Sequence, residues 1–309
     1  MVPYKVKNWI NIDYLNWNYL SRNENAIELL KCNQDKINWA ILSANPSALE
    51  LLESNKDKIN WMELSRNPNA IHLLERNPEY IDWTILSGNA NAMKLLEENV
   101  DKIDWHMLSS NPSAIELLIE NEDKIVWSEM SKNVNAVEFL ERNKDKVNWY
   151  SLLKNPRAVH MFCSIVNVIN PYLTLDDSWN IRHIYGQVSG NQNAIDILKD
   201  NANRIDWHEL SKNPGGIELL ETNLDKICWR NLSLNPNGIE LLEINRERID
   251  WNHISLNSSI FELDYQALKA RMDIVKEELM MKCFHPLRLL YFLEKYNYDI
   301  GDDEPFSLY

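Results

Sequence analysis

Tryptophan recurs along this chain at a fixed interval of 22 residues, and that interval restricts the fold more than any other feature of the sequence. Seven Trp residues keep the interval from Trp17 to Trp149, and three more keep it from Trp207 to Trp251. Tyr185 lies one interval before the second series. A period of about 20–50 residues is typical of proteins built from stacked units, so the sequence predicts eleven repeats. Their first residues are Trp17, Trp39, Trp61, Trp83, Trp105, Trp127, Trp149, Tyr185, Trp207, Trp229 and Trp251.

Each repeat, numbered from that first residue, follows the pattern W-x-x-L-S-x-N-P-x-A-I-x-L-L-E-x-N-x-D-K-I-D/N. Position 7 is Asn in all eleven repeats, including Asn67, Asn111 and Asn213, and Pro often follows it. Asn before Pro indicates a helix start, because the Asn oxygen accepts a bond from a free N–H group while Pro needs none. The apolar residues at positions 10, 11, 13 and 14 then form a helical stripe. We therefore expect two short helices in each repeat, with the Trp packed in the core.

Helices of about seven to nine residues are not stable alone in water, so each repeat must pack against its neighbours. This requirement predicts an all-α fold, an α-solenoid of short helix-turn-helix repeats with terminal caps. Stacked at about 10 Å per layer, eleven repeats would form an array on the order of 100 Å long. A leucine-rich repeat has a similar period, but it needs a strand with alternating apolar positions. The helical step from position 1 to position 4, and the Pro after Asn, favour helices instead.

Tandem copies of I-[ND]-W-x-x-L-S-x-N-P-x-A-I-x-L-L-E-x-N resemble the 22-residue repeat proteins encoded by giant DNA viruses, of the Mimivirus and Cafeteria roenbergensis virus kind. The resemblance covers about residues 12–260. It implies a helical solenoid made by a virus that replicates in the host cytoplasm, and it brings no catalytic residues. The 14 extra residues between Trp149 and Tyr185 depart from a regular array.

The pattern divides the chain into five segments. These are an N-terminal cap (1–16), repeats 1–7 (17–160), an irregular insertion (161–184), repeats 8–11 (185–260) and a helical C-terminal cap (261–309). In the last segment Leu268, Met272, Val275 and Leu279 form an apolar stripe at helical spacing. A dimerising or docking pair of helices is therefore the alternative to a cap.

The insertion is the candidate site for a specific partner. A partner bound to identical repeats could slip by one repeat at little cost, so only the ends and the insertion can fix its register. The insertion alone combines turn residues with aromatic side chains of the kind that anchor interfaces. The candidate contacts are Tyr172, Trp179, Asp176 and Asp177. The alternative is an insertion that bulges out without a function.

No motif in the sequence predicts an enzyme. The patterns HExxH, GxSxG, GxGxxG and the P-loop are absent. His72 and His160 share position 12 but lie four repeats apart, about 40 Å in a stack, so they cannot bind one metal ion. The favoured function is a non-enzymatic protein-interaction scaffold without a cofactor or metal. A structural or virion-associated spacer is one alternative, and an enzyme with its site in the insertion or C-terminal region is another.

Charge and cysteine content bear on the partners and the compartment. The net charge of -14 disfavours nucleic acid and anionic membranes as partners. Acidic residues dominate positions 12 and 15, so stacking should align them into acidic columns that could bind a basic protein. The insertion and the C-terminal helices are the segments through which the chain could associate with itself. Four scattered Cys residues without a CxxC motif favour an intracellular compartment, the host cytoplasm, with the virion as a further location.

Overall fold

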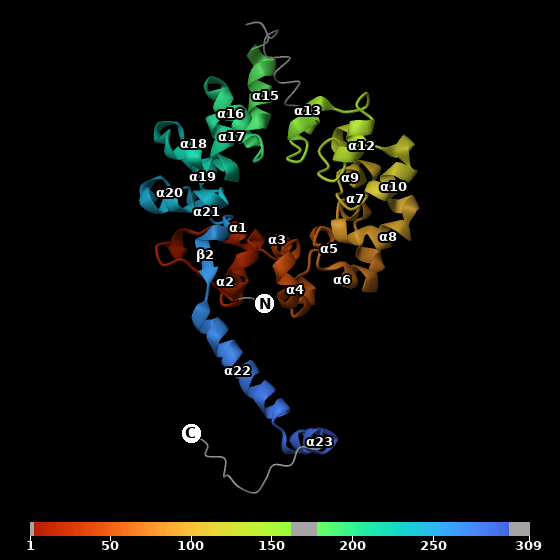
Figure 1. Cartoon of the computed structure of the whole chain (residues 1–309), viewed down its shortest axis with the longest axis vertical. Helices are drawn as coiled ribbons and strands as arrows, with labels where there is room; N and C mark the ends of the chain where they lie inside the picture. Colours follow the sequence, from red (N-terminus) through yellow and green to blue (C-terminus); the bar gives the residue numbers. More distant parts are fainter. Residues whose placement is uncertain (1–2, 162–177, 297–309) are drawn as a thin grey trace. The chain divides into compact units, whose positions relative to one another are not determined.

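The computed structural model describes residues 3–161 and 178–296. It separates into two compact bodies. The larger one, the repeat body, is Tyr4–Glu262, and the smaller one joins Met1–Pro3 to Leu263–Tyr309. The repeat body has the expected all-α repeat architecture (Figure 1).

The first helix of each repeat, the A helix, begins at position 1 in the regular repeats. The residue before it caps it: the Asn60 side chain, for example, accepts a 3.1 Å hydrogen bond from the Glu63 N–H group. The A helices are α1 (Trp17–Arg22), α3 (Trp39–Ser43), α5 (Trp61–Leu64), α7 (Trp83–Ser87), α9 (Trp105–Ser109), α11 (Trp127–Met130), α13 (Trp149–Leu152), α15 (Ser178–Gly190), α17 (Trp207–Lys212), α19 (Trp229–Leu232) and α21 (Trp251–Ile254).

The second helix, the B helix, follows a single 3-10 or irregular turn after the Asn at position 7. The described B helices are α2 (Ile27–Lys31), α4 (Leu49–Glu53), α6 (Ile71–Arg76), α8 (Met93–Glu97), α10 (Ile115–Glu120), α12 (Val137–Arg142), α16 (Ile195–Asp200), α18 (Ile217–Glu221) and α20 (Ile239–Ile244). Successive A helices pack on one another along the inside of the arc, and the B helices lie outside them (Figure 1).

The core runs between these two layers. The apolar side chain at position 4, such as Leu64 or Leu108, is fully buried in every repeat, as is the Ala or Gly at position 10 in most. The Trp side chains are half-buried, which differs from the expected core position. One face of the ring packs on the core, and in most repeats a cation at position 20 covers the other: Lys124 Nζ lies 4.4 Å from the centre of the Trp105 ring.

The Asn at position 7 holds neighbouring repeats together as well as capping a turn. Asn67 is buried, and its side-chain oxygen accepts from the Asn69 N–H group at 3.0 Å, as predicted for a cap. Its Nδ2 group donates to the carbonyls of Ser43 and Asn45 in the preceding repeat, at 3.1 and 2.9 Å. The eleven Asn residues therefore form a continuous buried ladder from repeat to repeat.

The Ser at position 5 makes a second link. Ser43 Oγ donates to the Trp39 carbonyl at 2.8 Å and accepts at 2.9 Å from the N–H group of Asn60, the last residue of the same repeat, which caps the A helix of the next one. In the part of the chain that the structure describes, the Ser hydroxyl thus joins the A helix of one repeat to the start of the A helix in the next. Repeat 7 has Leu153 in place of Ser, and it is the repeat that precedes the insertion.

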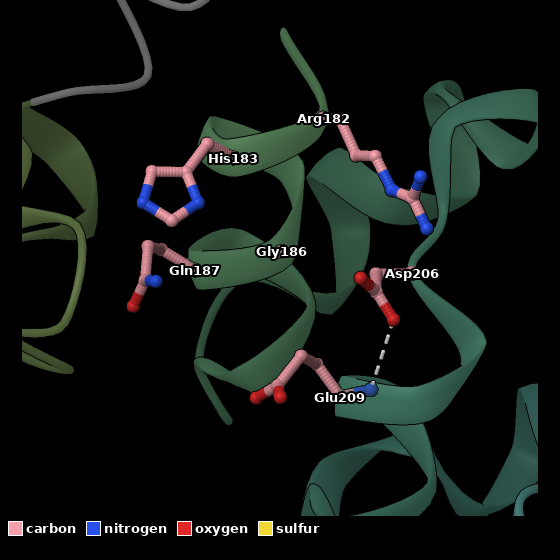
Figure 2. Close-up of a pocket in the computed structure, with 6 residues that line it drawn as sticks. All are labelled: Arg182, His183, Gly186, Gln187, Asp206 and Glu209. Carbon is pink, nitrogen blue, oxygen red and sulfur yellow. Dashed lines mark hydrogen bonds between the residues drawn. The ribbon is translucent and has the colours of Figure 1, made fainter. Parts of the chain in front are cut away.

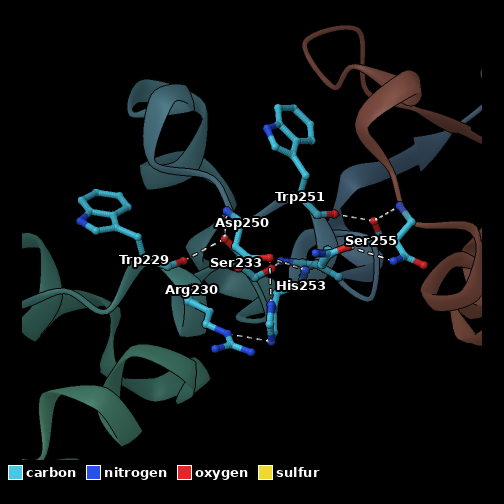
Figure 3. Close-up of polar contacts among 10 residues, drawn as sticks. Trp229, Arg230, Ser233, Asp250, Trp251, His253 and Ser255 are labelled. Atoms are coloured by element: carbon cyan, nitrogen blue, oxygen red, sulfur yellow. Dashed lines mark hydrogen bonds and ion pairs between the residues drawn. The ribbon is translucent and has the colours of Figure 1, made fainter.

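The repeat body closes on itself, because repeat 1 packs on repeat 11 through the same contacts. Asn23 Nδ2 donates to the Ser255 and Asn257 carbonyls at 3.0 and 3.2 Å. The Asn16 N–H group donates to Ser255 Oγ at 2.9 Å (Figure 3). The array is therefore a closed ring of eleven repeats and not the elongated stack expected from the sequence.

Residues 11–16 complete repeat 11 and do not form the expected N-terminal cap. They read N-I-D-Y-L-N, which matches positions 17–22 of the repeat. The centre of the Tyr14 ring lies 5.2 Å from that of the Trp251 ring. Within repeat 3, the Tyr80 and Trp61 rings make the equivalent contact at 4.9 Å. Leu15 is buried like the Ile at position 21 of other repeats. The first and last parts of the chain thus share one repeat.

The seam between repeats 7 and 8 is also regular, although the insertion separates them in sequence. Asn191 Nδ2 donates to the Leu153 and Asn155 carbonyls at 3.0 and 3.3 Å. Asn193 Nδ2 donates to the Pro156 carbonyl at 2.9 Å. The insertion therefore leaves the ring unbroken at the Asn ladder.

After repeat 11 the chain leaves the repeat pattern. The strand β2 (Phe261–Leu263) pairs with β1 (Tyr4–Val6) in a two-stranded sheet. Two helices follow, α22 (Tyr265–Cys283) and α23 (Pro286–Tyr296). Repeat 1 packs on the end of repeat 11, where the sequence predicted a C-terminal cap. No side chain of α22 is buried.

Candidate functional site

Positions 2, 3 and 6 of the A helices form one surface, which we call the A face. These positions follow one another on one side of a helix, and they lie beside their counterparts in the stacked neighbours. Position 2 is exposed in nine of the eleven repeats and holds nine residue types, whereas position 7 holds Asn throughout. The A face is thus a variable surface on a constant framework.

Position 18 varies as widely as position 2. Its neighbours at positions 17, 19 and 20 are nearly constant, with Asn, an acid and a cation in most repeats. Position 18 therefore gives isolated variable side chains, while the A face gives a continuous variable surface. Extended surfaces of this kind are the ones that solenoid proteins use for binding.

The A face also differs from the rest of the chain in charge. Positions 2, 3 and 6 together hold six Lys or Arg residues and three acids, although the chain has a net charge of -14. The three acids neutralise cations of their own repeats, as Glu209 does with Lys212 at 2.6 Å. Four exposed cations of this surface form no ion pair within the described part of the chain. They are Arg22, Lys154, Arg230 and, on the lengthened helix of repeat 8, Arg182.

Helix α15 extends the A face in repeat 8. It has 13 residues, whereas the other A helices have four to six. The extra turns place Arg182 and His183 on the same side as Gly186, Gln187 and Gly190, because residues four apart share a helix face. The insertion thereby gives this repeat a surface that the ten others lack.

A hollow of about 380 Å³ lies beside this extended helix (Figure 2). Cations and acids both line it. The lining residues are Arg182, His183, Gly186, Gln187, Asp206 and Glu209. A Cβ atom at Gly186 would point toward Asp206 Oδ2, 3.7 Å away, so the missing side chain keeps the hollow open.

Repeat 7 closes one side of this region. The Tyr150 ring stacks on the His183 ring with centres 5.0 Å apart, and its hydroxyl contacts His183 Nε2. Gln187 Nε2 donates to the same hydroxyl at 3.3 Å. These contacts fix aromatic and polar groups on one side of α15, while Arg182 extends on the other side toward Asp206 (Figure 2).

A second polar cluster lies on the A face of repeats 10 and 11 (Figure 3). Asp250 Oδ1 accepts from the His253 N–H group and contacts His253 Nδ1, both at 2.9 Å, and Arg230 Nε lies 3.4 Å from His253 Nε2. Burial raises the pKa of Asp250, but the hydrogen bonds from His253 and the charges of His253 and Arg230 outweigh it and lower the pKa.

This Asp–His pair lacks a nucleophile. The nearby Ser233 and Ser255 are buried, and each both donates to a Trp carbonyl and accepts from a backbone N–H group. Among the described residues no group of three His, Cys, Asp or Glu side chains could hold a metal ion. The cluster therefore holds a cation and an imidazole side by side, and its geometry is not that of a catalytic triad.

The structure describes only one of the four contact residues predicted from the sequence. Tyr172, Asp176 and Asp177 lie outside the described residues. Trp179 lies in the first turn of α15, the helix that carries Arg182 and His183. Their role in binding stays a prediction.

The expected acidic columns lie on the B helices and are partly neutralised there. Lys31 at position 15 lies 3.1 Å from Glu50 at position 12 of the next repeat. The same bridge joins Lys199 to Glu218 at 2.8 Å; this contact lowers the pKa of Glu218 and raises that of Lys199. Where one column holds a cation, the neighbouring column supplies the acid.

Comparisons with protein-family models, with curated proteins and with solved structures found no match for this chain. The predicted relationship to viral repeat proteins thus stays a prediction. Among the described residues, no helix has the length and apolar character needed to cross a membrane.

Two signals in the sequence could have identified this site. One is the variation at position 2 within a chain that otherwise repeats itself. The other is the absence of Glu at position 3 in repeats 1 and 7, so that Arg22 and Lys154 at position 6 have no acid three residues before them. Both signals need the knowledge that positions 2, 3 and 6 share a surface across repeats.

Proposed function

We propose that this protein is a non-enzymatic interaction scaffold that binds an acidic segment of another protein along its A face. The unpaired cations Arg22, Lys154, Arg182 and Arg230 carry this proposal. In the closed ring repeat 1 follows repeat 11, so repeats 7 to 11 and repeat 1 form six neighbouring repeats. The four cations lie in repeats 7, 8, 10 and 1 of this series. His208 and His253 occupy the A face in those two repeats.

Physical chemistry favours a protein partner with local negative charge. Exposed cations that form no ion pair within the described part of the chain can form charge-assisted hydrogen bonds with carboxylates of a partner. Tyr19, Tyr150 and the imidazole rings beside them add contact area of the kind that anchors interfaces. The net charge of -14 opposes the approach of a nucleic acid backbone, whose charge is uniformly negative.

A matched pair of charge reversals tests the proposal. Lys154→Glu with Arg182→Glu changes the A face, while Lys56→Glu with Lys144→Glu makes the same change in charge at position 18. Each variant and the parent would be used to capture proteins from host cells, with quantitative mass spectrometry of the bound fraction. We expect one or more acidic proteins to be captured at least tenfold less by the A-face variant and equally by the position-18 variant.

The melting temperatures of the three proteins should agree, because all four lysines and arginines are exposed. Equal capture of every protein by the two variants would contradict the proposal. A capture that depends on the position-18 lysines instead would place the binding surface at the turns that follow the B helices.

A further inference from the structure

The two C-terminal helices expose an unusual amount of apolar surface. Of 23 large hydrophobic side chains that are exposed in the described chain, 13 lie between Tyr265 and Tyr296. On α22 these include Met272, Val275 and Leu279, which are 65%, 56% and 58% exposed. Contiguous apolar surface of this kind on a folded protein marks a site of association.

The apolar residues of α22 follow the spacing of a coiled coil. Tyr265, Leu268, Met272, Val275 and Leu279 are separated by three, four, three and four residues. Steps that alternate between three and four keep these residues on one side of the helix and let them interlock with a partner helix. Asp264 caps the start of this helix by accepting from the Gln266 and Ala267 N–H groups, at 3.1 and 3.0 Å.

The charges on α22 favour a second copy of the same helix. The helix carries both signs in near balance, while the chain as a whole has a net charge of -14. Its charged residues are Lys269, Arg271, Asp273, Lys276, Glu277, Glu278 and Lys282. Because its four cations and three acids nearly cancel, α22 can pack on a second copy of itself without the repulsion that the net charge of the chain would otherwise cause.

Taken together, α22, Phe284 and α23 expose enough apolar area for one side of a stable dimer. Five aromatic rings between Tyr265 and Tyr296 are 39–73% exposed. At about 200 Å² each, they leave on the order of 600 Å² of apolar surface in water. The methionine, leucine, isoleucine and valine side chains raise this beyond the roughly 800 Å² per partner of a standard interface.

We infer that α22 and α23 form a dimerisation element, in which the heptad face of α22 packs against the same face of a second copy of this chain. The inference is independent of the proposed function, because it involves neither the A face nor the ring. Its consequence is that each assembly holds two rings and therefore two A faces.

Sedimentation equilibrium of the full chain over a wide range of concentration tests this inference. We expect the parent to have twice the 36.4 kDa mass of one chain. Met272→Glu with Leu279→Glu places two charges in the heptad face and should raise the dissociation constant at least 100-fold. Ile274→Glu with Met281→Glu makes the same change away from that face, at side chains that are 58% and 69% exposed, and should leave the dimer intact.

Circular dichroism of all three proteins checks that the repeat body is folded in each. A parent that is monomeric at every concentration would overturn the inference, and would indicate that another part of the chain or a different protein covers α22. Equal loss of the dimer in both double variants would also overturn it, because the heptad face would then have no special role.

Discussion

Deletion of residues 1–16 is expected to lower the free energy of unfolding of the repeat body by about 5 kcal/mol, a large part of the 5–15 kcal/mol typical of a folded domain. These residues complete repeat 11. They bury Ile10 and Leu15, each worth about 1.5–3 kcal/mol, and supply the Tyr14 ring that covers Trp251. They also donate the Asn16 N–H group to Ser255 Oγ. Thermal and urea unfolding followed by circular dichroism would measure the loss.

Deletion of residues 265–309 is the matched control. It removes more of the chain, but no side chain of α22 is buried, so the unfolding of the repeat body should change by less than about 0.5 kcal/mol. If deletion of residues 1–16 changed the free energy of unfolding as little as this control does, residues 1–16 would be a dispensable end of an open array.

Asn67→Ala is expected to destabilise the protein by about 3–4 kcal/mol. A simple helix cap contributes about 1 kcal/mol. Asn67 in addition supplies two hydrogen bonds to the preceding repeat, and its loss leaves the buried carbonyls of Ser43 and Asn45 without these partners. Each unsatisfied buried group costs about 1–3 kcal/mol. Urea titration measures the difference, provided that the slope of the transition is unchanged.

Asn23→Ala should have the same effect as Asn67→Ala, although Asn23 belongs to the first repeat. In the closed ring it donates to Ser255 and Asn257, just as Asn67 donates within the array. Asn55→Ala is the control, because Asn55 makes one 2.9 Å bond to Leu51 inside its own repeat and should cost about 1 kcal/mol. A cost for Asn23→Ala near that of Asn55→Ala would contradict closure.

Much of this architecture could be predicted from the sequence. The 22-residue interval gave the repeats, and the Asn–Pro pair and the apolar stripe gave the two helices of each. Closure could not be derived in the same way, because it depends on a small rotation between neighbouring repeats that no single residue encodes. The match of residues 11–16 to positions 17–22 is its one visible signal.

The candidate site was harder to predict. The sequence shows that the insertion breaks the repeat, but it does not show that the insertion lengthens the A helix that follows it. Because α15 begins at Ser178, Arg182 and His183 are helical residues on the A face, whereas the repeat pattern would place them in a turn. The Trp side chains showed a similar limit: their spacing indicates packing, but only the fold shows that a Lys at position 20 covers the outer face of rings such as that of Trp105.

The distance between position 2 of the first repeat and position 2 of the last repeat tests the central claim most directly. Spin labels at Asn18→Cys and Asn252→Cys, in a chain whose four natural Cys residues are replaced by Ser, would report it by electron paramagnetic resonance. A second pair at Asn18→Cys and Ala40→Cys gives the reference for adjacent repeats. A closed ring predicts the same short distance for both pairs, about 10 Å between helix axes plus the lengths of the labels. A distance for the Asn18–Asn252 pair on the order of 100 Å, as in an open stack of eleven layers, would contradict closure.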